Sequence, residues 1–302
     1  MLSTIWHHLT AEAGAMNLEQ LRARLETPES RYIELQGMQV HYRDAGDPQA
    51  PVLILLHGIF SSLHTWNGWT ELLRRDFRVI SIDAPNFGLT GPHPRGMFRH
   101  LYSDFLNDFT NALGIRRCSV AGNSLGGWMS WEFAARFPHK VDKLMLLDSA
   151  GFFFVPPLPL VSMAMPLGGW MASRVVPPRR AFYALIRSAY GRPQRLSQDT
   201  MERYYQLWLR PGNRRAGARV LRFVRNHGGF NAQLLAAVTQ PVLIMWGRDD
   251  QWIPPAHAGY FARSLPQAET IMYDDCGHMP MEELAQQSAA AALTFLHASR
   301  TD

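Results

Sequence analysis

The sequence predicts an α/β protein with a mostly parallel sheet, flanking helices and an inserted helical cap. Short, continuous apolar runs alternate with helical patterns, as is typical of parallel strands buried on both faces. One of these runs leads directly into a Gly-x-Ser-x-Gly turn and a helix. The alternation stops over residues 151–240 and then resumes. We therefore expect an N-terminal helical extension (1–30), an α/β core (31–150 and 241–302) and a cap (151–240).

The first thirty residues predict two short helices outside the sheet. Apolar side chains share one helical face in each of the stretches 2–9 and 18–25. We expect both to pack on the body, with an interfacial anchor as the alternative, since tryptophan and leucine suit the headgroup boundary. No apolar run is long enough to cross a bilayer, and no secretory signal is expected. Two cysteines make no disulfide framework, so we expect a cytoplasmic protein, peripheral to the membrane if the anchor exists.

The core elements follow in an order that places loops at one edge of the sheet. A hairpin with Gly37 near its turn is expected first, at residues 32–35 and 38–43. Buried strands are then expected at 51–56, 77–82, 118–121, 141–148, 241–245 and 270–273, and helices at 65–73, 101–113, 127–135 and 283–297. Because ligands of parallel sheets bind at the carboxyl ends of the strands, the residues after each strand are the candidates for a site.

Gly122-Asn123-Ser124-Leu125-Gly126 predicts a nucleophile elbow. The chain must reverse so sharply between strand and helix that only glycine fits at the two outer positions. Ser124 is thereby raised out of the sheet at the start of a helix, where free N–H groups and the helix dipole favour negative charge.

A second turn beyond a strand end offers a backbone donor. His57 and Gly58 directly follow the run 51–56, and Gly58 lets the backbone turn so that the N–H of Ile59 points into a cleft. The N–H of Leu125 is the natural second donor. Acyl transfer needs such a pair because charge develops on the carbonyl oxygen in the transition state. We expect Ile59 and Leu125 to form an oxyanion hole, and His57 to be structural rather than a base.

Acidic residues and a histidine follow the last two predicted strands. Asp249 and Asp250 come after the first of them, and His278 comes after the second. The order serine, acid, histidine is the one that a nucleophile elbow requires. Histidine takes the proton of the serine hydroxyl, and a carboxylate fixes the tautomer of the imidazole. We expect Ser124, His278 and one of the two aspartates to form a triad, and spacing alone does not separate Asp249 from Asp250.

The cap differs from the core in composition. Prolines interrupt its first part, and helical patterns follow at residues 181–190, 198–209 and 214–226. Residues 174–225 hold thirteen arginines, no lysine and two acidic residues, a local net charge of +11 in a chain of +5. This is either a solvated surface or a site for anions such as membrane headgroups, an acidic partner or a negative substrate. No nucleic-acid partner is expected, because no recognition motif accompanies the charge.

Taken together, the motifs resemble those of the α/β-hydrolase superfamily, in its single-domain esterase and lipase branch. The matching stretches are His57-Gly58, Asp83-x-Pro85-x-Phe87-Gly88, Gly122-Asn123-Ser124-Leu125-Gly126-Gly127, Trp246-Gly247-x-x-Asp250-x-x-x-Pro254 and Gly277-His278. They span residues 32–297 in the usual order. Asn86 stands where relatives carry glycine, and asparagine tolerates the left-handed backbone that this turn needs.

The resemblance implies a serine hydrolase that cleaves carboxylic esters through an acyl-enzyme. The acid of the family falls on Asp250, which gives the triad Ser124–His278–Asp250, with Asp249 as its rival. No metal or organic cofactor is implied. We expect small-molecule esters that are mostly apolar, because large apolar side chains follow the strand that ends at residue 148. These side chains are Phe152, Phe153, Phe154, Leu158, Leu160, Met163, Met165 and Leu167.

Two other functions remain open. Carbon–carbon bond hydrolases of ring-cleavage products share Gly-Asn-Ser-x-Gly-Gly, but usually carry a glycine-rich turn after His-Gly and a tryptophan after the histidine. Here residues 59–62 and Met279 occupy those places. The other alternative is a non-catalytic hydrolase fold that binds a membrane or a protein through its basic cap.

Overall fold

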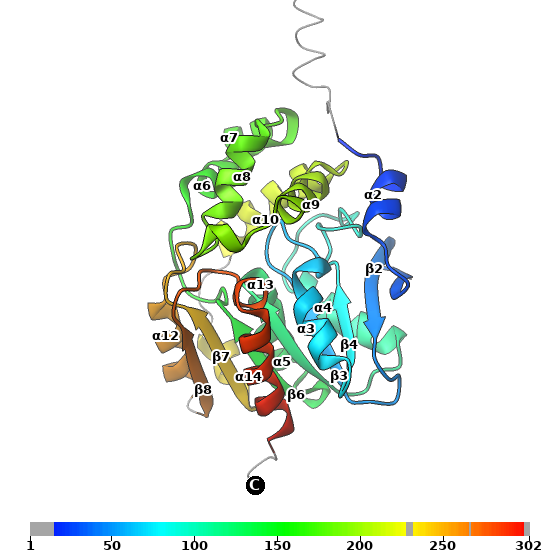
Figure 1. The fold of residues 1–302 in the computed structure, drawn as a ribbon, viewed down its shortest axis with the longest axis vertical. Coiled ribbons are helices and arrows are strands. Elements are labelled where there is room, and N and C mark those ends of the chain that lie inside the picture. Colours follow the sequence, from blue (N-terminus) through cyan, green and yellow to red (C-terminus); the bar gives the residue numbers. More distant parts are fainter. Residues whose placement is uncertain (1–14, 228–231, 266, 299–302) are drawn as a thin grey trace, which may run out of the picture.

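An eight-stranded sheet forms the centre of the structure, a computed structural model that describes residues 15–227, 232–265 and 267–298 (Figure 1). The strand order is β1-β2-β4-β3-β5-β6-β7-β8. β1 and β2 pair antiparallel, β2 pairs antiparallel with β4, and all later pairs are parallel. The strands are β1 (Ser30–Leu35), β2 (Met38–Ala45), β3 (Val52–Leu56), β4 (Arg78–Ile82), β5 (Cys118–Asn123), β6 (Val141–Leu147), β7 (Val242–Gly247) and β8 (Ala268–Tyr273). The predicted hairpin and mostly parallel sheet are confirmed.

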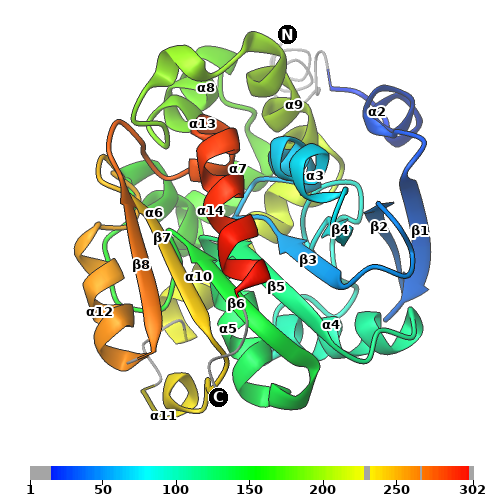
Figure 2. The same cartoon turned by 60° about the horizontal axis from the view of Figure 1, so that its bottom comes forward.

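Helices cover both faces of this sheet, which explains its continuous apolar strands. α3 (Asn67–Leu73) and α14 (Ala285–His297) contact each other on one face. α4 (Leu101–Ala112), α5 (Leu125–Arg136), α11 (Ala232–Ala236) and α12 (Ala256–Ser264) lie on the other (Figure 2). The apolar side chains of β3, β5, β6 and β7 are accordingly buried from both sides. Short helices η1 (Leu63–Trp66), η2 (Pro138–Lys140) and α13 (Pro280–Glu283) complete the core.

The cap lies beyond one end of the sheet (Figure 1). Three of its later helices agree with the sequence: α8 (Arg179–Arg187), α9 (Gln198–Leu209) and α10 (Asn213–His227). The short helix η3 (Pro193–Arg195) was not predicted. Its first part contains two more helices, α6 (Leu158–Ala164) and α7 (Pro166–Arg174), where prolines had suggested interruption. Pro159 and Pro166 fall in the first turn of each helix, where the missing N–H breaks no hydrogen bond.

The N-terminal extension contributes α2 (Leu18–Leu25), which opens with a capping box between Asn17 and Gln20. Leu21 and Leu25 are buried against Leu89 and Leu207, so this helix packs on the body as expected. The predicted stripe at residues 2–9 lies outside the described residues. Among the helices described, none has both the length and the apolar character needed to cross a bilayer.

Candidate active site

Ser124 stands on a strained turn between β5 and α5. Its backbone has φ 57° and ψ −117°, a conformation that side chains rarely adopt. A β-carbon on Gly122 would overlap the Gly126 carbonyl, and one on Gly126 would overlap the Leu56 carbonyl. Only glycine therefore permits this turn, which presents the Ser124 side chain to two cavities.

His278 lies next to Ser124 and is hydrogen-bonded to Asp250. The Nδ1 atom of His278 is 2.7 Å from Oδ2 of Asp250, and both side chains are buried. The other oxygen of Asp250 accepts the N–H groups of Trp252 and Ile253, at 2.7 and 3.1 Å. Asp249 is 44% exposed and pairs with Arg192 instead, at 3.6 Å. The geometry thus distinguishes the two neighbouring aspartates and brings Asp250 to the histidine.

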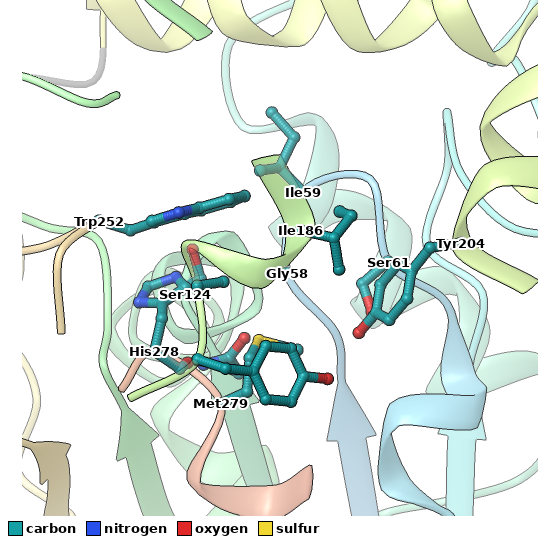
Figure 3. Close-up of a pocket in the computed structure, with 12 residues that line it drawn as sticks. Gly58, Ile59, Ser61, Ser124, Ile186, Tyr204, Trp252, His278 and Met279 are labelled. Atoms are coloured by element: carbon teal, nitrogen blue, oxygen red, sulfur yellow. The ribbon is translucent and has the colours of Figure 1, made fainter. Parts of the chain in front are cut away.

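The remaining ring nitrogen of His278 is free to act. Nε2 is buried and has no hydrogen-bond partner among the described residues. Figure 3 shows the imidazole beside the Ser124 hydroxyl. With Nδ1 donating to a carboxylate, Nε2 of a neutral imidazole carries a lone pair and accepts a proton.

The loop that carries His278 is fixed by both the core and the cap. The N–H of His278 donates to the Ala189 carbonyl at 2.7 Å, and Nδ2 of Asn123 donates to the His278 carbonyl at 2.9 Å. A β-carbon on Gly277 would overlap the backbone of Gly191. The segment that follows α8 therefore lies directly against this loop.

The Glu283 carboxylate accepts hydrogen bonds from the same two segments. One carboxylate oxygen accepts the N–H of Gly277 at 2.8 Å, and the other accepts the N–H of Arg192 at 3.0 Å. Burial raises the pKa of Glu283, and these backbone donors offset only part of that rise. The carboxylate thus links a cap residue to the histidine loop.

Trp252 stacks on the imidazole of His278. The ring centroids are 5.4 Å apart and the planes are inclined by 29°. Its indole N–H donates to the Ser188 hydroxyl at the end of α8, at 3.0 Å. A flat ring held in this way limits the imidazole to one orientation, and its π face attracts an imidazolium.

A second carboxyl group, Asp148, lies beside Asp250. It follows β6, and its Oδ1 accepts the N–H of Gly247 at 3.0 Å. Complete burial raises the pKa of Asp148 well above its usual value, and the negative charge of Asp250 raises it further. Asp148 is therefore the carboxyl of this pair that retains a proton.

Asp148, Asp250 and His278 are the one group of possible metal ligands among the described residues, with candidate atoms within 4.8 Å of one another. Their hydrogen bonds fit a cation poorly. Nδ1 of His278 and Oδ2 of Asp250 already bind each other, and backbone N–H groups occupy one further oxygen on each aspartate. A cation would have to displace the bond that orients the imidazole.

Two backbone N–H groups are available near Ser124. Neither Ile59 nor Leu125 donates its N–H to another described residue, and Leu125 opens α5, where the first N–H groups lack acceptors within the helix. The Ile59 turn is close, since a β-carbon on Gly58 would stand 3.1 Å from Cβ of Ser124. Both residues line the large cavity described below.

His57 and Asn86 have structural places near this turn. Nδ1 of His57 bonds to the Gly58 carbonyl at 2.7 Å, and Nε2 accepts the Ala84 N–H at 3.0 Å, so both ring nitrogens are engaged. Full burial lowers its pKa. Asn86 adopts φ 82°, the left-handed backbone expected of it.

Two cavities meet at Ser124, Ile59, Trp252 and His278. The larger has a volume of about 290 Å³ and is lined almost entirely by apolar side chains from residues 150–164, α10 and the turn at Trp252. Among the described residues on its wall, Arg225 alone carries a permanent charge. The space is large enough for an extended acyl chain.

The smaller cavity, about 20 Å³, extends from Ser124 toward Ser61 and Tyr204 (Figure 3). Ser61 and Tyr204 stand at its far end, where the Ser61 hydroxyl donates to the Tyr204 hydroxyl at 3.3 Å. Behind them Glu282 accepts hydrogen bonds from Tyr204 and Tyr190. A cavity of this size with polar groups on its wall has room for about one water molecule.

The sheet, the elbow and this site define a class of protein. The family model described as the alpha/beta hydrolase fold matches residues 51–284, and the chain belongs to that family. Lipase 1 of Psychrobacter immobilis is 27% identical over 263 residues, covering 84% of this chain and 79% of the lipase. A 2-hydroxy-6-oxononadienedioate/2-hydroxy-6-oxononatrienedioate hydrolase of a Pseudomonas species is 25% identical over 288 residues, covering 91% and 99%.

The fold is also found among solved structures. A membrane phospholipase A, described as a bacterial virulence factor, superposes with a TM-score of 0.78 over 100% of this chain and 91% of its own. At 22% identity, this likeness shows the fold alone. The chain is a hydrolase-family protein with both lipase and carbon–carbon hydrolase relatives.

Two residues of the site were not predicted from sequence. Asp148 ends a predicted strand, as Asp250 follows one, and that shared position was the available signal. Its proximity to Asp250 depends on β6 pairing with β7. Trp252 carries no such signal, since its contact with His278 arises from the path of the loop after β7.

Proposed function

We propose that the protein is a serine hydrolase that cleaves carboxylic esters of mostly apolar substrates. The observation that carries this proposal is the position of Ser124: a strained elbow beside a histidine with a free nitrogen, opening into a large apolar cavity. The lipase relative supports ester chemistry. Ser124, His278 and Asp250 are the proposed catalytic residues.

The proposed reaction has two steps. Nε2 of His278 takes the proton of the Ser124 hydroxyl as its oxygen attacks the ester carbonyl, and the N–H groups of Ile59 and Leu125 stabilise the oxyanion. The imidazolium then protonates the departing alkoxide, leaving an acyl group on Ser124. Water, deprotonated by His278, attacks this acyl-enzyme, and the imidazolium returns the proton to the Ser124 oxygen as the acid departs. Asp250 fixes the imidazole tautomer and stabilises its charge throughout.

The unequal cavities suggest where the substrate parts lie. A space of about 20 Å³ accommodates a water molecule but no chain. The acyl chain therefore belongs in the cavity of about 290 Å³. Water in the small cavity would stand beside His278.

The competing function is carbon–carbon bond hydrolysis of a ring-cleavage diacid, which the Pseudomonas relative suggests. Two carboxylates would need cationic partners in the cavities. The described lining offers Arg225 alone, and Arg203, behind the small cavity, is paired with Glu282 at 3.3 Å. This charge pattern favours the ester.

The test compares hydrolysis of p-nitrophenyl butyrate and of a 2-hydroxy-6-oxo dienedioate by the wild type and by Ser124→Ala. We expect ester turnover that the substitution lowers by a factor approaching 10⁶, the loss measured for a serine in a related triad. Ser119→Ala, in the same strand, serves as the control with unchanged activity. Preference for the diacid would identify the carbon–carbon hydrolase, and no turnover of either substrate would indicate a binding module.

A further inference from the structure

The solvent-exposed surface of α6, α7 and the residues next to them is rich in large apolar side chains. Ten large apolar side chains are exposed in the described structure, and eight of them lie between residues 153 and 175. Single exposed apolar residues are ordinary, but such a concentration marks an interaction surface. We name these eight residues the outer face: Phe153, Val155, Leu158, Met165, Leu167, Trp170, Met171 and Val175.

α7 shows that this exposure follows the helix geometry. Leu167, Trp170, Met171 and Arg174 are spaced i, i+3, i+4 and i+7, so they form one stripe, and all four are exposed. Gly169, by contrast, is buried, against Met163 and Ala218. The helix thus buries its smallest side chain and exposes its largest apolar ones, the reverse of what packing within a monomer favours.

Two arginines lie at the outer face, in a part of the sequence poor in acidic residues. No Asp or Glu occurs in residues 149–198. The Arg174 guanidinium stacks on Trp170 at 4.6 Å, and that of Arg225 contacts Sδ of Met165 at 2.8 Å. Neither arginine forms an ion pair with another described residue. A second copy of this chain would bring like charges together, whereas an anionic lipid surface complements both the charge and the apolar stripe.

The same segment connects the outer face with the large cavity. Phe154, Leu160 and Ala164 line that cavity, while Leu158 and Met165 are exposed on the same stretch. Phe153 and Val155 belong to both, since they are exposed and also line the cavity. Contact of the outer face with a bilayer would therefore place one wall of the cavity next to the acyl chains of the lipid. Esters that partition into the membrane would reach Ser124 over a short apolar path.

We propose that the outer face is a docking surface for anionic membranes, through which the protein takes up lipid-phase esters. The docking stands on the surface alone; the nature of the substrate rests on the proposed ester hydrolysis. Trp170 and Leu167 insert at the headgroup boundary, and Arg174 and Arg225 bind the lipid phosphates.

The test is flotation of the full chain with vesicles of phosphatidylcholine alone or mixed with phosphatidylglycerol. We expect binding to the mixed vesicles, weakened by salt. The double variant Leu167→Glu/Trp170→Glu should bind at least about tenfold less, because it replaces buried apolar area by charge that the anionic lipid repels. Leu72→Glu, at an exposed leucine far along the chain in α3, is the matched control and should bind as the wild type does.

Each failure has a distinct meaning. Equal vesicle binding by the double variant and the wild type would overturn the outer face as the site. A concentration-dependent dimer in gel filtration that the double variant abolishes would show that a second copy covers it instead. Hydrolysis of a soluble short ester should be unchanged in the double variant, while hydrolysis of a vesicle-embedded ester falls. Vesicle binding without any ester hydrolysis would refute the proposed function and leave the docking surface intact.

Discussion

The two halves of the cap relate to the core in opposite ways. The segment that follows α8 is hydrogen-bonded to two loops of the site: the Ala189 carbonyl accepts the N–H of His278, and the Ser188 hydroxyl accepts the indole N–H of Trp252. Gly191, in the same segment, packs directly against the His278 loop. α6 and α7 make no hydrogen bond to the His278 loop in the described structure; α6 lines the large cavity, and both helices have an apolar exterior. We expect the first half to hold His278 in place and the second to contact the substrate. We expect substitutions in the first to alter kcat and those in the second to alter substrate preference.

The largest effect is expected on the carboxylate that orients His278. Asp250→Asn should lower kcat by about 10⁴, the loss seen when a related triad loses the correct imidazole tautomer. Asp249→Asn is the matched control, because Asp249 pairs with Arg192 at the surface. Steady-state kinetics with a p-nitrophenyl ester separate the two. If Asp249→Asn were the inactive variant, the assignment would be off by one residue.

The second effect tests the half of the cap that lines the large cavity. Each added methylene contributes up to about 0.8 kcal/mol, so kcat/KM should rise by up to about fourfold per carbon from acetate to butyrate to hexanoate esters. Val161→Trp fills the large cavity and should lower kcat/KM for hexanoate by about tenfold while acetate changes little. Leu167→Trp, on the exposed side of α7, should leave the series unchanged. A flat series in the wild type would rule out an apolar acyl cavity.

A smaller effect tests the half of the cap that is hydrogen-bonded to the loops of the site. Ser188→Ala removes the hydrogen bond to the Trp252 indole, worth about 1 kcal/mol, so kcat should fall by about fivefold with KM nearly unchanged. Ser173→Ala makes the same change in α7 and should have no effect. If Trp252→Phe is combined with Ser188→Ala, the losses should not add, because both remove one bond. Additive losses would mean that Ser188 acts through another contact.

The smallest expected effect is at Asp148, and it concerns the stability of the fold. The folded protein holds a proton there that the unfolded chain releases above the ordinary pKa of 3.8, so this group makes stability fall as pH rises from that value toward the raised one. Asp148→Asn cannot lose such a proton. Melting temperatures across a pH series should therefore decline less in the variant and be higher by a few degrees above neutral pH. An unchanged slope would show that Asp148 is ionised in the folded protein.

The sequence predicted most of the core because its signals are local. Apolar runs mark buried strands wherever they fall, and the two glycines around Ser124 record a backbone constraint within five residues. α6 and α7 were missed because proline interrupts a helix only beyond its first turn. Spacing alone did not separate Asp249 from Asp250, and only the resemblance to the hydrolase family placed the acid at Asp250. The proximity of Asp148 to Asp250 depends on the pairing of β6 with β7, which no local pattern records.

The contact between Gly191 and Gly277 sets a boundary for building chimeras of this enzyme fold. A β-carbon on Gly191 would stand 2.7 Å from the backbone of residues 276 and 277, closer than folded chains allow. A foreign cap grafted across this point must supply a glycine and the following backbone geometry, or it will displace the loop that carries His278. The tight glycine contacts within residues 153–175, those of Gly168 and Gly169 with Ser162 and Met163, stay inside that segment. The segment exchanged to transplant a new acyl preference should therefore end before α8 begins at Arg179.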